Sequence, residues 1–277
     1  MATSDPKSSN VPQELANEPR DESLSTVVPT NNNKNVKKQK RGRRRRSNKS
    51  VNVNSKSSNK FSVFVSNIRG AASKSDSLQS IVNNPSIDPE VISLVETNFK
   101  QNKKLKLDGY KSFNKNKVSG NMGGISVFVK ECDIDKAIKA AEGNDSNEYL
   151  VTRHSQFKVP INIITIYGEQ ESRSKVEDVE KKWNKIMEEI IKIEERNEFI
   201  ILCGDFNKSV GDIVPGNKPK VSHGGKLVRE FLSSEKYVLV NKLPQVKNGP
   251  FTRYDTSDPY CLEKKSVLDL VIISKGL

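Results

Sequence analysis

The chain has 277 residues, of which 47 are Lys or Arg and 34 are Asp or Glu, so its formal net charge is +13. This length suits one large domain or two small ones. The three cysteines, Cys132, Cys203 and Cys261, are too far apart for a disulfide framework or a paired-cysteine zinc site, and they suggest a reducing compartment. No apolar run approaches the roughly 20 residues of a membrane helix, and residues 1–20 hold no apolar segment of a secretory signal. We therefore expect a protein that meets polyanions and no membrane.

Most of the excess positive charge lies in the first 60 residues. This segment has no Phe, Trp or Tyr and carries 14 Lys or Arg against 5 Asp or Glu, so +9 of the +13 belongs to it and +4 to the rest. Such a composition cannot bury enough apolar surface to offset the entropy lost on ordering. We predict that 1–60 is a disordered basic tail and that 61–277 is the folded domain.

The tail contains a dense basic run, KNVKKQKRGRRRR at 34–46, in which nine of thirteen residues are basic. Because neutralising phosphates releases counterions, such a run can bind DNA or RNA without reading base sequence. It is also typical of a nuclear-import signal, which favours the nucleus over the cytoplasm; a solvated tail without a partner is the alternative. The nucleic-acid-binding candidates in the run are Lys37, Lys38, Lys40, Arg41, Arg43, Arg44, Arg45 and Arg46.

From residue 61 onward, short β-branched apolar runs alternate with amphipathic segments, which is the pattern of an α/β domain. The apolar stripe of the longest helix, which includes Val176 and Trp183, is read as core. In chain order, the pattern predicts a strand at 61–67, a helix capped by Ser75-Asp76-Ser77, strands at 91–97 and 124–130, a weaker strand at 149–155, a strand at 161–168, a helix at 175–197, a strand at 199–205, a helix after Gly224-Gly225, and strands at 237–241 and 267–274.

Polar side chains occur where several of these strands end. They are Asn67, Glu96, Tyr167, Asp205 with Asn207, and, on the last strand, Asp269. Ligands of α/β folds bind where strand ends gather, and carboxylates, amides and a phenol suit a hard divalent cation and a phosphate. Taken singly, each has a plain structural alternative: turn-forming asparagines, a capping aspartate, a solvated glutamate or a packing tyrosine.

The chain resembles the endonuclease/exonuclease/phosphatase family over about residues 61–277, and most closely the apurinic-endonuclease-like domain of non-LTR retrotransposons, which precedes a reverse transcriptase. GDFN after an apolar strand is the most specific of the motifs. The resemblance rests on SNIRG (66–70), LVET (94–97), MGGISVFV (122–129), TIYGEQ (165–170), ILCGDFN (201–207), FTR (251–253) and SVLDLVIIS (266–274).

The resemblance implies a four-layer α/β sandwich of two mixed sheets flanked by helices, and hydrolysis of a phosphate ester with Mg²⁺ or Mn²⁺. By that likeness, Glu96 would ligate the metal with Asn67 nearby, and Asp205 would position or deprotonate the attacking water. Asn207 would hold the phosphate oxygens, and Tyr167 would donate to the phosphate. Thr252 would line the DNA groove, whose loops would be 208–224 and 242–265.

The chain departs from the family pattern at two places. The family has a Ser-Asp-His motif after its last shared strand, and its histidine is oriented by the aspartate equivalent to Asp269. The two histidines here, His154 and His223, do not follow Ser-Asp and are read as structural or surface residues. We therefore expect a domain incomplete at its C-terminus with impaired activity. Arg69, in place of an acidic residue, favours target nicking over abasic-site repair.

Three functions remain in competition. The first is a metal-dependent DNA endonuclease domain that nicks target DNA and continues into a reverse transcriptase. The second is a catalytically dead or domesticated nucleic-acid-binding relic of such a domain. The third is a phosphatase of the same superfold, because a shared fold does not settle the substrate.

Overall fold

The chain is described here from a computed structural model that places residues 61–100, 103–117, 123–144, 148–171, 174–215, 217, 219–244 and 267–277. These residues belong to the larger of two units of the chain, Ser57–Leu277. The predicted disordered tail at 1–60, with its basic run, lies outside the described residues.

The first sheet has four strands in the order β1-β2-β4-β3. β1 and β2 are parallel, and the other pairs are antiparallel. β2 is buried along its whole length, because it lies between neighbours and is covered on both faces. The strands are β1 (Val63–Asn67), β2 (Val91–Val95), β3 (Tyr110–Lys115) and β4 (Ile125–Lys130).

The second sheet has six strands in the order β5-β6-β7-β8-β10-β9. β7 and β8 are parallel, and the remaining pairs are antiparallel, so this sheet is also mixed. The strands are β5 (Ala137–Glu142), β6 (Glu148–His154), β7 (Ile161–Tyr167), β8 (Phe199–Asp205), β9 (Tyr237–Leu239) and β10 (Asp269–Ser274).

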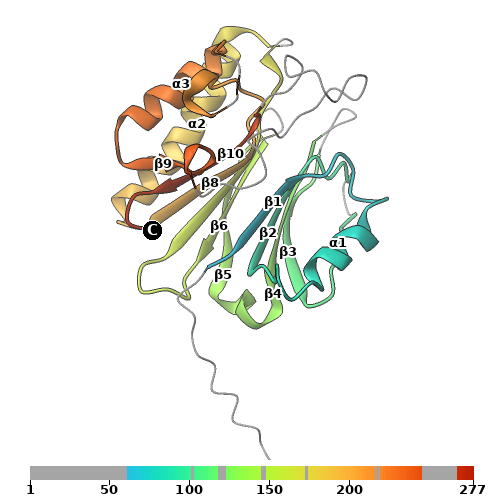
Figure 1. Ribbon diagram of the computed structural model, residues 1–277. Helices are drawn as coiled ribbons and strands as arrows, with labels where there is room; N and C mark the ends of the chain where they lie inside the picture. Colours follow the sequence, from blue (N-terminus) through green and yellow to red (C-terminus); the bar gives the residue numbers. More distant parts are fainter. Residues whose placement is uncertain are drawn as a thin grey trace, which may run out of the picture. The chain divides into compact units, whose positions relative to one another are not determined.

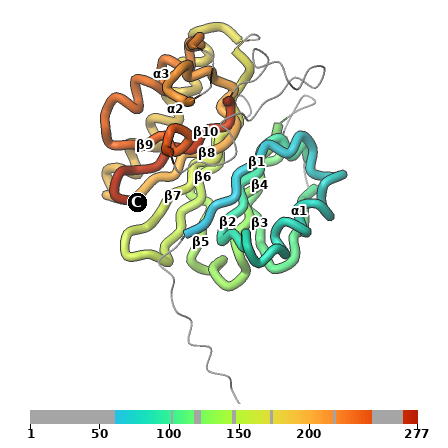
Figure 2. Tube along the Cα trace, viewed as in Figure 1, coloured from blue at the N-terminus to red at the C-terminus, as the bar shows by residue number. Residues whose placement is uncertain are grey.

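Helices cover the outer faces of the two sheets (Figures 1 and 2). α1 (Ser75–Val82) packs on the first sheet, while α2 (Val176–Glu195) and α3 (His223–Ser233) pack on the second. Short 3₁₀ turns η1 (Glu131–Lys136), η3 (Gly211–Ile213) and η4 (Val240–Lys242) complete the connections. The predicted four-layer α/β sandwich of two mixed sheets is confirmed.

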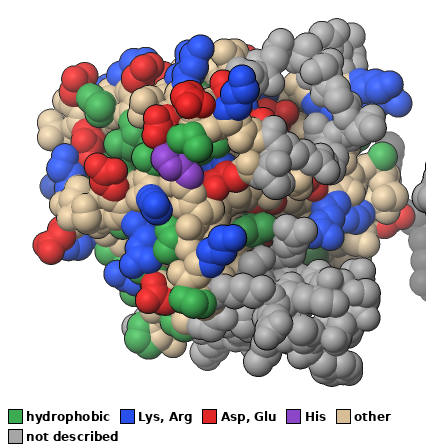
Figure 3. All heavy atoms as spheres, turned by 90° about the horizontal axis from the view of Figure 1, so that it is seen from above, with side chains coloured by type: hydrophobic (Ala, Val, Ile, Leu, Met, Phe, Trp, Pro, Cys, Tyr) green, Lys and Arg blue, Asp and Glu red, His purple; other side chains and the backbone are tan. Residues whose placement is uncertain are grey.

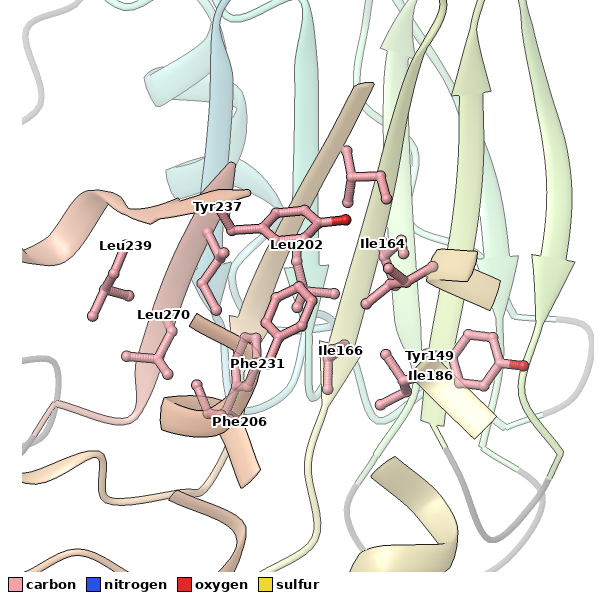
Figure 4. Packing of buried hydrophobic residues seen from close by; sticks show 14 of the residues in the cluster. Tyr149, Ile164, Ile166, Ile186, Leu202, Phe206, Phe231, Tyr237, Leu239 and Leu270 are labelled. Atoms are coloured by element: carbon pink, nitrogen blue, oxygen red, sulfur yellow. The ribbon is translucent and has the colours of Figure 1, made fainter. Parts of the chain in front are cut away.

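Three apolar clusters hold the layers together, and each lies between two of them. One lies between the sheets and contains Val127, Leu150 and Ile163. A second lies between the six-stranded sheet and α2 and α3, where Phe206, Phe231 and the neighbouring aliphatic side chains pack together (Figure 4). The third lies under α1. Each fully buried aliphatic or aromatic side chain contributes about 1.5–3 kcal/mol of transfer free energy, so these clusters supply most of the drive to fold.

Two edge strands, β3 and β5, were not predicted from the sequence, because they lack a continuous apolar run. β3 is the outermost strand of the first sheet, and β5 is the outermost of the second. The sequence of β5, AIKAAE, leaves most of its side chains exposed, so it lacks the apolar run that marks a covered strand. The weaker candidate at 149–155 is confirmed as a strand, β6.

Both shorter helices begin differently from the prediction. Lys74 is the N-cap of α1 without a side-chain cap, and Ser75-Asp76-Ser77 lies inside the first turn, so the predicted capping is wrong. The cap of α3 is Ser222, whose hydroxyl accepts a hydrogen bond from the backbone N–H of Gly225, and both glycines lie in the first turn. The stripe of α2 is core as predicted, except that Val176 at its first turn is 48% exposed. Among the described residues, no helix is long and apolar enough to span a membrane.

His154 provides a prediction on the pH dependence of stability. Burial in β6 lowers its pKa to about 4, because the low-polarity interior disfavours the imidazolium, while Asp133 opposes this shift weakly. As the pH falls, the unfolded chain binds a proton on His154 near pH 6.5, whereas the folded chain does not bind it until about pH 4. The unfolding free energy should therefore fall by about 3 kcal/mol as the pH is lowered across that interval. Urea unfolding across this pH range measures the loss.

The matched variant is His154→Leu, which keeps an apolar side chain of similar length. Its Thr152 neighbour loses a 3.0 Å hydrogen-bond partner, so its absolute stability changes, but its unfolding free energy should depend less steeply on pH between those two values. The half-buried His223 remains in both proteins and cancels from the difference. Equal slopes for the two proteins would contradict the assignment.

Candidate active site

The polar residues predicted at strand ends meet at one edge of the two sheets, at the upper ends of the strands in Figure 1. Asn67, Tyr167 and Asp205 are the last residues of their strands, and Glu96 follows β2 directly. Tyr167 lies opposite Asp205 across the parallel β7/β8 pair. Asp269 begins an antiparallel strand, so it too lies opposite Asp205.

Asn67 and Asp205 connect the two sheets through a side-chain hydrogen bond. The Nδ2 of Asn67 donates to Oδ2 of Asp205 at 2.8 Å, although the residues are 138 positions apart in sequence. The other end of the Asn67 amide accepts a 3.1 Å hydrogen bond from the backbone N–H of Arg69, whose φ of 45° turns the chain sharply. The amide is therefore held in one orientation, with its donor toward Asp205.

Glu96 is held in a buried position beside Tyr167. The residue is only 7% exposed, and its backbone has a φ of 54°. Its Oε1 accepts a 2.6 Å hydrogen bond from the Tyr167 hydroxyl. Burial raises the pKa of Tyr167 well above its ordinary value, and the hydrogen bond to Glu96 and the charges of Asp205 and Glu148 add to this shift. The phenol therefore stays protonated near neutral pH and remains a hydrogen-bond donor.

The segment Asp205–Asn207 is fixed from three sides. Oδ1 of Asp205 accepts a 2.9 Å hydrogen bond from the backbone N–H of Asn207, and the Asn207 side chain donates to the carbonyl of Gly168 at 2.7 Å. Between them, Phe206 is 2% exposed and packs into the apolar cluster between the six-stranded sheet and the helices α2 and α3 (Figure 4). Gly168 must be glycine, because a Cβ there would lie 2.0 Å from the carbonyl oxygen of Phe206.

Asn241 is a contributor that sequence reasoning missed. Its side chain donates to the backbone carbonyl of Asp269 at 3.1 Å and accepts from the backbone N–H of Val271 at 2.8 Å. It therefore holds the start of β10, which places Asp269 beside the end of β8. In the sequence, Asn241 looks like a turn residue after a short strand, and nothing marks it as a neighbour of Asp269.

Three charged residues beside the site were also missed: Glu148, Lys115 and Lys117. Glu148 begins β6 opposite Tyr167, and the two lysines lie at and beyond the end of β3. Burial raises the pKa of Glu148, while its hydrogen bond from Gly124 and the charges of the two lysines lower it and the charge of Glu96 raises it further. No local pattern distinguishes these residues from ordinary surface charges, and only the tertiary structure brings them to the site.

The oxygen ligands at this edge suit a hard divalent cation. Among the described residues, there is no group of three or more His, Cys, Asp or Glu side chains that could hold a metal ion by themselves. Mg²⁺ does not need one, because it is often bound by one or two carboxylates together with waters and substrate phosphates. Oε2 of Glu96 makes no hydrogen bond with any described residue, whereas Oε1 is engaged by Tyr167. The residues present therefore fit Mg²⁺ or Mn²⁺ through Glu96, with Asn67 nearby.

The remaining predicted residues lie elsewhere or outside the described part. His154 is fully buried in β6, and His223 begins α3 with its Nε2 2.9 Å from Oε1 of Glu180. Both are structural or surface residues, as expected. Thr252 and the basic residues from Lys37 to Arg46 lie outside the described residues, as does most of the predicted groove loop 242–265.

Comparison with known proteins shows similarity of structure but not of sequence. No family model and no curated protein matches the sequence. The catalytic domain of Xenopus laevis APE2 superimposes with a TM-score of 0.62 at 15% identity, covering 78% of this chain and 83% of that one. The DNA-bound 3′ phosphatase NExo from Neisseria gives a TM-score of 0.58 at 15% identity, with 78% and 87% covered. The endonuclease domain of TRAS1, a telomere-specific non-LTR retrotransposon, gives 0.51 at 15% identity, with 78% and 85% covered. The chain therefore has the fold of the endonuclease/exonuclease/phosphatase family.

Proposed function

We propose that the domain is a metal-dependent phosphodiesterase that nicks DNA, of the retrotransposon endonuclease type. The observation that supports it best is the pairing of two polar contacts at one sheet edge. Asp205 is bound by Asn67 from the opposite sheet, and Glu96 is bound by Tyr167. These contacts involve two carboxylates, an amide and a protonated phenol, which are groups that could act in hydrolysis of a phosphate ester.

Each side chain has a part that follows from its contacts. Asp205 would orient the attacking water and accept its proton, since donors on both of its oxygens hold the carboxylate in place. Asn207 uses one amide hydrogen on Gly168, which leaves its second for a nonbridging phosphate oxygen. Tyr167 has one hydroxyl proton, which it donates to Glu96 in this structure, so it would donate to the phosphate by exchanging that hydrogen bond when substrate binds. Asp269 would support Asp205 from the neighbouring strand.

Glu96 would hold the metal ion, with Asn67 nearby. When bound, Mg²⁺ or Mn²⁺ would neutralise charge on the phosphate oxygens and lower the pKa of bound water. Such a cation would also account for a buried carboxylate at this edge with one oxygen engaged by Tyr167 and the other without a described hydrogen-bond partner.

We expect turnover by the 277-residue chain to be slow. Neither of its two histidines lies at the site, and the groups of a catalytic unit lose most of their rate when one is absent. Assays should therefore use protein in excess over DNA, so that a single turnover is measured.

The polyanion partner of the basic run belongs to the same proposal. On the described part of the face in Figure 3, acidic and basic side chains are interspersed, in keeping with the small net charge of the folded domain. The run at 34–46 would supply the long-range attraction to DNA or RNA and direct the protein to the nucleus. Continuity with a reverse transcriptase in a longer protein is part of this proposal.

The proposal is tested by nicking of supercoiled plasmid DNA. The expected result is slow conversion to the relaxed form that requires Mg²⁺ or Mn²⁺ and stops with EDTA. A phosphorylated sugar, assayed for phosphate release, distinguishes the phosphatase of the same fold. DNA binding with no cleavage under any metal would support the nucleic-acid-binding relic, and phosphate release from the sugar alone would support the phosphatase.

Metal binding has a second test that does not depend on activity. At a Mg²⁺ concentration ten times the dissociation constant, binding should stabilise the folded chain by about 1.4 kcal/mol, which raises the melting temperature by about 3–6 °C. Glu96→Gln should remove this increase, because it replaces the anionic ligand by a neutral amide of the same shape. Thermal unfolding with and without Mg²⁺ measures the effect.

The control for this variant is Glu142→Gln, which changes a solvent-facing carboxylate that pairs with Lys139 on β5. It should keep the full response to Mg²⁺. A response that persists in Glu96→Gln would place the cation elsewhere.

A further inference from the structure

Two lysines beside the candidate active site are buried to an unusual degree. Lys115 ends β3 and is 7% exposed, and Lys117, two residues further on, is 9% exposed. Lysine is almost never so buried unless its ammonium is paired, because removing the charge from water is costly. Because little of either side chain is in contact with water, an anion beside the ammonium groups would stabilise both lysines.

No direct anionic partner is present within the described part of the chain. Neither lysine has a side-chain hydrogen bond or an ion pair within 4.0 Å there, although ten other Lys or Arg side chains in that part form ion pairs. Their ammonium nitrogens are not among the solvent-excluded polar atoms that lack a partner, so each remains within reach of a ligand. The stems are buried, and the charged ends stay accessible.

Lys115 faces the interface between the two sheets, and Lys117 follows it two residues beyond the end of β3. Side chains two apart on a strand share a face, and Phe113, two residues before Lys115, packs into the cluster between the sheets. β3 contacts β6 across this interface, and the charges of both lysines lower the pKa of Glu148 at the start of β6. Glu148 in turn lies opposite Tyr167, so the lysines are next to the candidate active site.

Two glycines, Gly123 and Gly124, hold the Glu148 carboxylate in place. The backbone N–H of Gly124 donates to Oε2 of Glu148 at 2.7 Å. Gly123 and Gly124 both have positive φ, and a Cβ on Gly123 would lie 2.3 Å from Oε1 of Glu148. The carboxylate therefore occupies a tight position against the backbone, where the charges of the two lysines and of Glu96 act on it.

We propose that Lys115 and Lys117 bind a backbone phosphate of the nucleic-acid strand next to the one that is cleaved, and that Glu148 is their counter-ion within the chain. The substrate class rests on the proposed function. A phosphate would supply the hydrogen bonds that the two ammonium groups lack, and two cations on one anion form a strong, charge-assisted contact. Glu148 would weaken this contact, because it competes with the phosphate for the same positive charge.

The experiment measures binding of a short labelled DNA duplex to the full chain in EDTA, as a function of salt concentration. Lys115→Met and Lys117→Met keep the buried stems and remove the charge. Each should weaken binding about tenfold at low salt and reduce the slope of log affinity against log salt by about 1. The basic run contributes equally to all variants, so it cancels from the differences.

Three further proteins complete the comparison. Lys236→Met removes a lysine that is 64% exposed and pairs with Glu194 beside β9, and it should leave the slope unchanged. Lys115→Arg keeps the charge and should restore binding. Glu148→Gln should tighten binding about two- to fivefold, since it removes the competing carboxylate. Melting temperatures confirm that each variant is folded.

Unchanged slopes in both folded lysine variants would overturn the proposal, as would weaker binding by Glu148→Gln. Inorganic phosphate is the second probe. If it competes with DNA for the wild-type chain but the lysine variants keep their DNA slopes, the lysines hold free phosphate and not a strand. Because binding is measured without metal, this result is independent of plasmid nicking, and either proposal can fail alone.

Discussion

Asp205→Asn is expected to lower the single-turnover rate of plasmid nicking by about 100- to 10,000-fold, which is the range for loss of a positioned general base. The two oxygens of Asp205 each accept one hydrogen bond, from the Asn67 side chain and from the backbone N–H of Asn207. An amide has only one acceptor atom, so one of these contacts must become a clash of two donors. The variant loses both the base and the orientation of its neighbour.

The control is Asp88→Asn. Asp88 lies outside the predicted groove loops and has a side chain that is 61% exposed and pairs with Lys130, so its neutralisation should leave the rate within about twofold. Equal rates for wild type and Asp205→Asn would show that the cleavage arises elsewhere or from a contaminant. A parallel fall in both variants would indicate a general effect of surface charge on DNA binding.

Gly204→Ala is expected to destabilise the domain by about 4 kcal/mol or more, which is the range of the most severe single substitutions. Gly204 has a φ of +127°, and a Cβ there would lie 2.2 Å from the carbonyl oxygen of Ile166 on the neighbouring strand. Backbone cannot move aside as a flexible side chain can, so β7 and β8 would have to separate at the residues that precede Tyr167 and Asp205. Chemical unfolding measures the loss.

Gly109→Ala separates backbone strain from the clash. Gly109 also has a positive φ, +80°, but no atom lies within 4 Å of a Cβ built on it. The Gly109→Ala variant should lose about 1–2 kcal/mol of unfolding free energy from backbone strain alone. A loss of similar size in the two variants would mean that the close approach of β7 and β8 at Gly204 relaxes at little cost.

The local patterns of the sequence were sufficient where burial is continuous. β2, β4, β7 and β8 are covered on both faces, so their apolar runs are long enough to stand out from their surroundings. β3 and β5 lie at sheet ends and carry few buried apolar side chains, so their pairing with β4 and β6 had no local signature. The predicted starts of α1 and α3 were wrong, because the residue that caps a helix depends on the backbone geometry of its first turn, which the sequence pattern does not show.

The candidate site divides in the same way. Asn67, Glu96, Tyr167 and Asp205 each follow an apolar run, so their position at strand ends could be read from the chain. Their hydrogen bonds could not, because Asn67 and Asp205 are 138 residues apart and their sheets must first pack face to face. Asn241 and Glu148 show the limit most clearly. Each is an ordinary polar residue until β10 and β6 bring it beside Asp269 and Tyr167.

The sequence by itself determined the α/β class, the separation of a basic tail from a nearly balanced domain, and the residues at four strand ends. These follow from composition and from the short periods of strands and helices, which are local properties. The tertiary structure alone decided which ends meet, which carboxylate oxygens are engaged, and that Lys115 and Lys117 are buried beside Glu148. Those facts depend on contacts between residues distant in the chain, and electrostatic and packing energies act through space and not along the sequence.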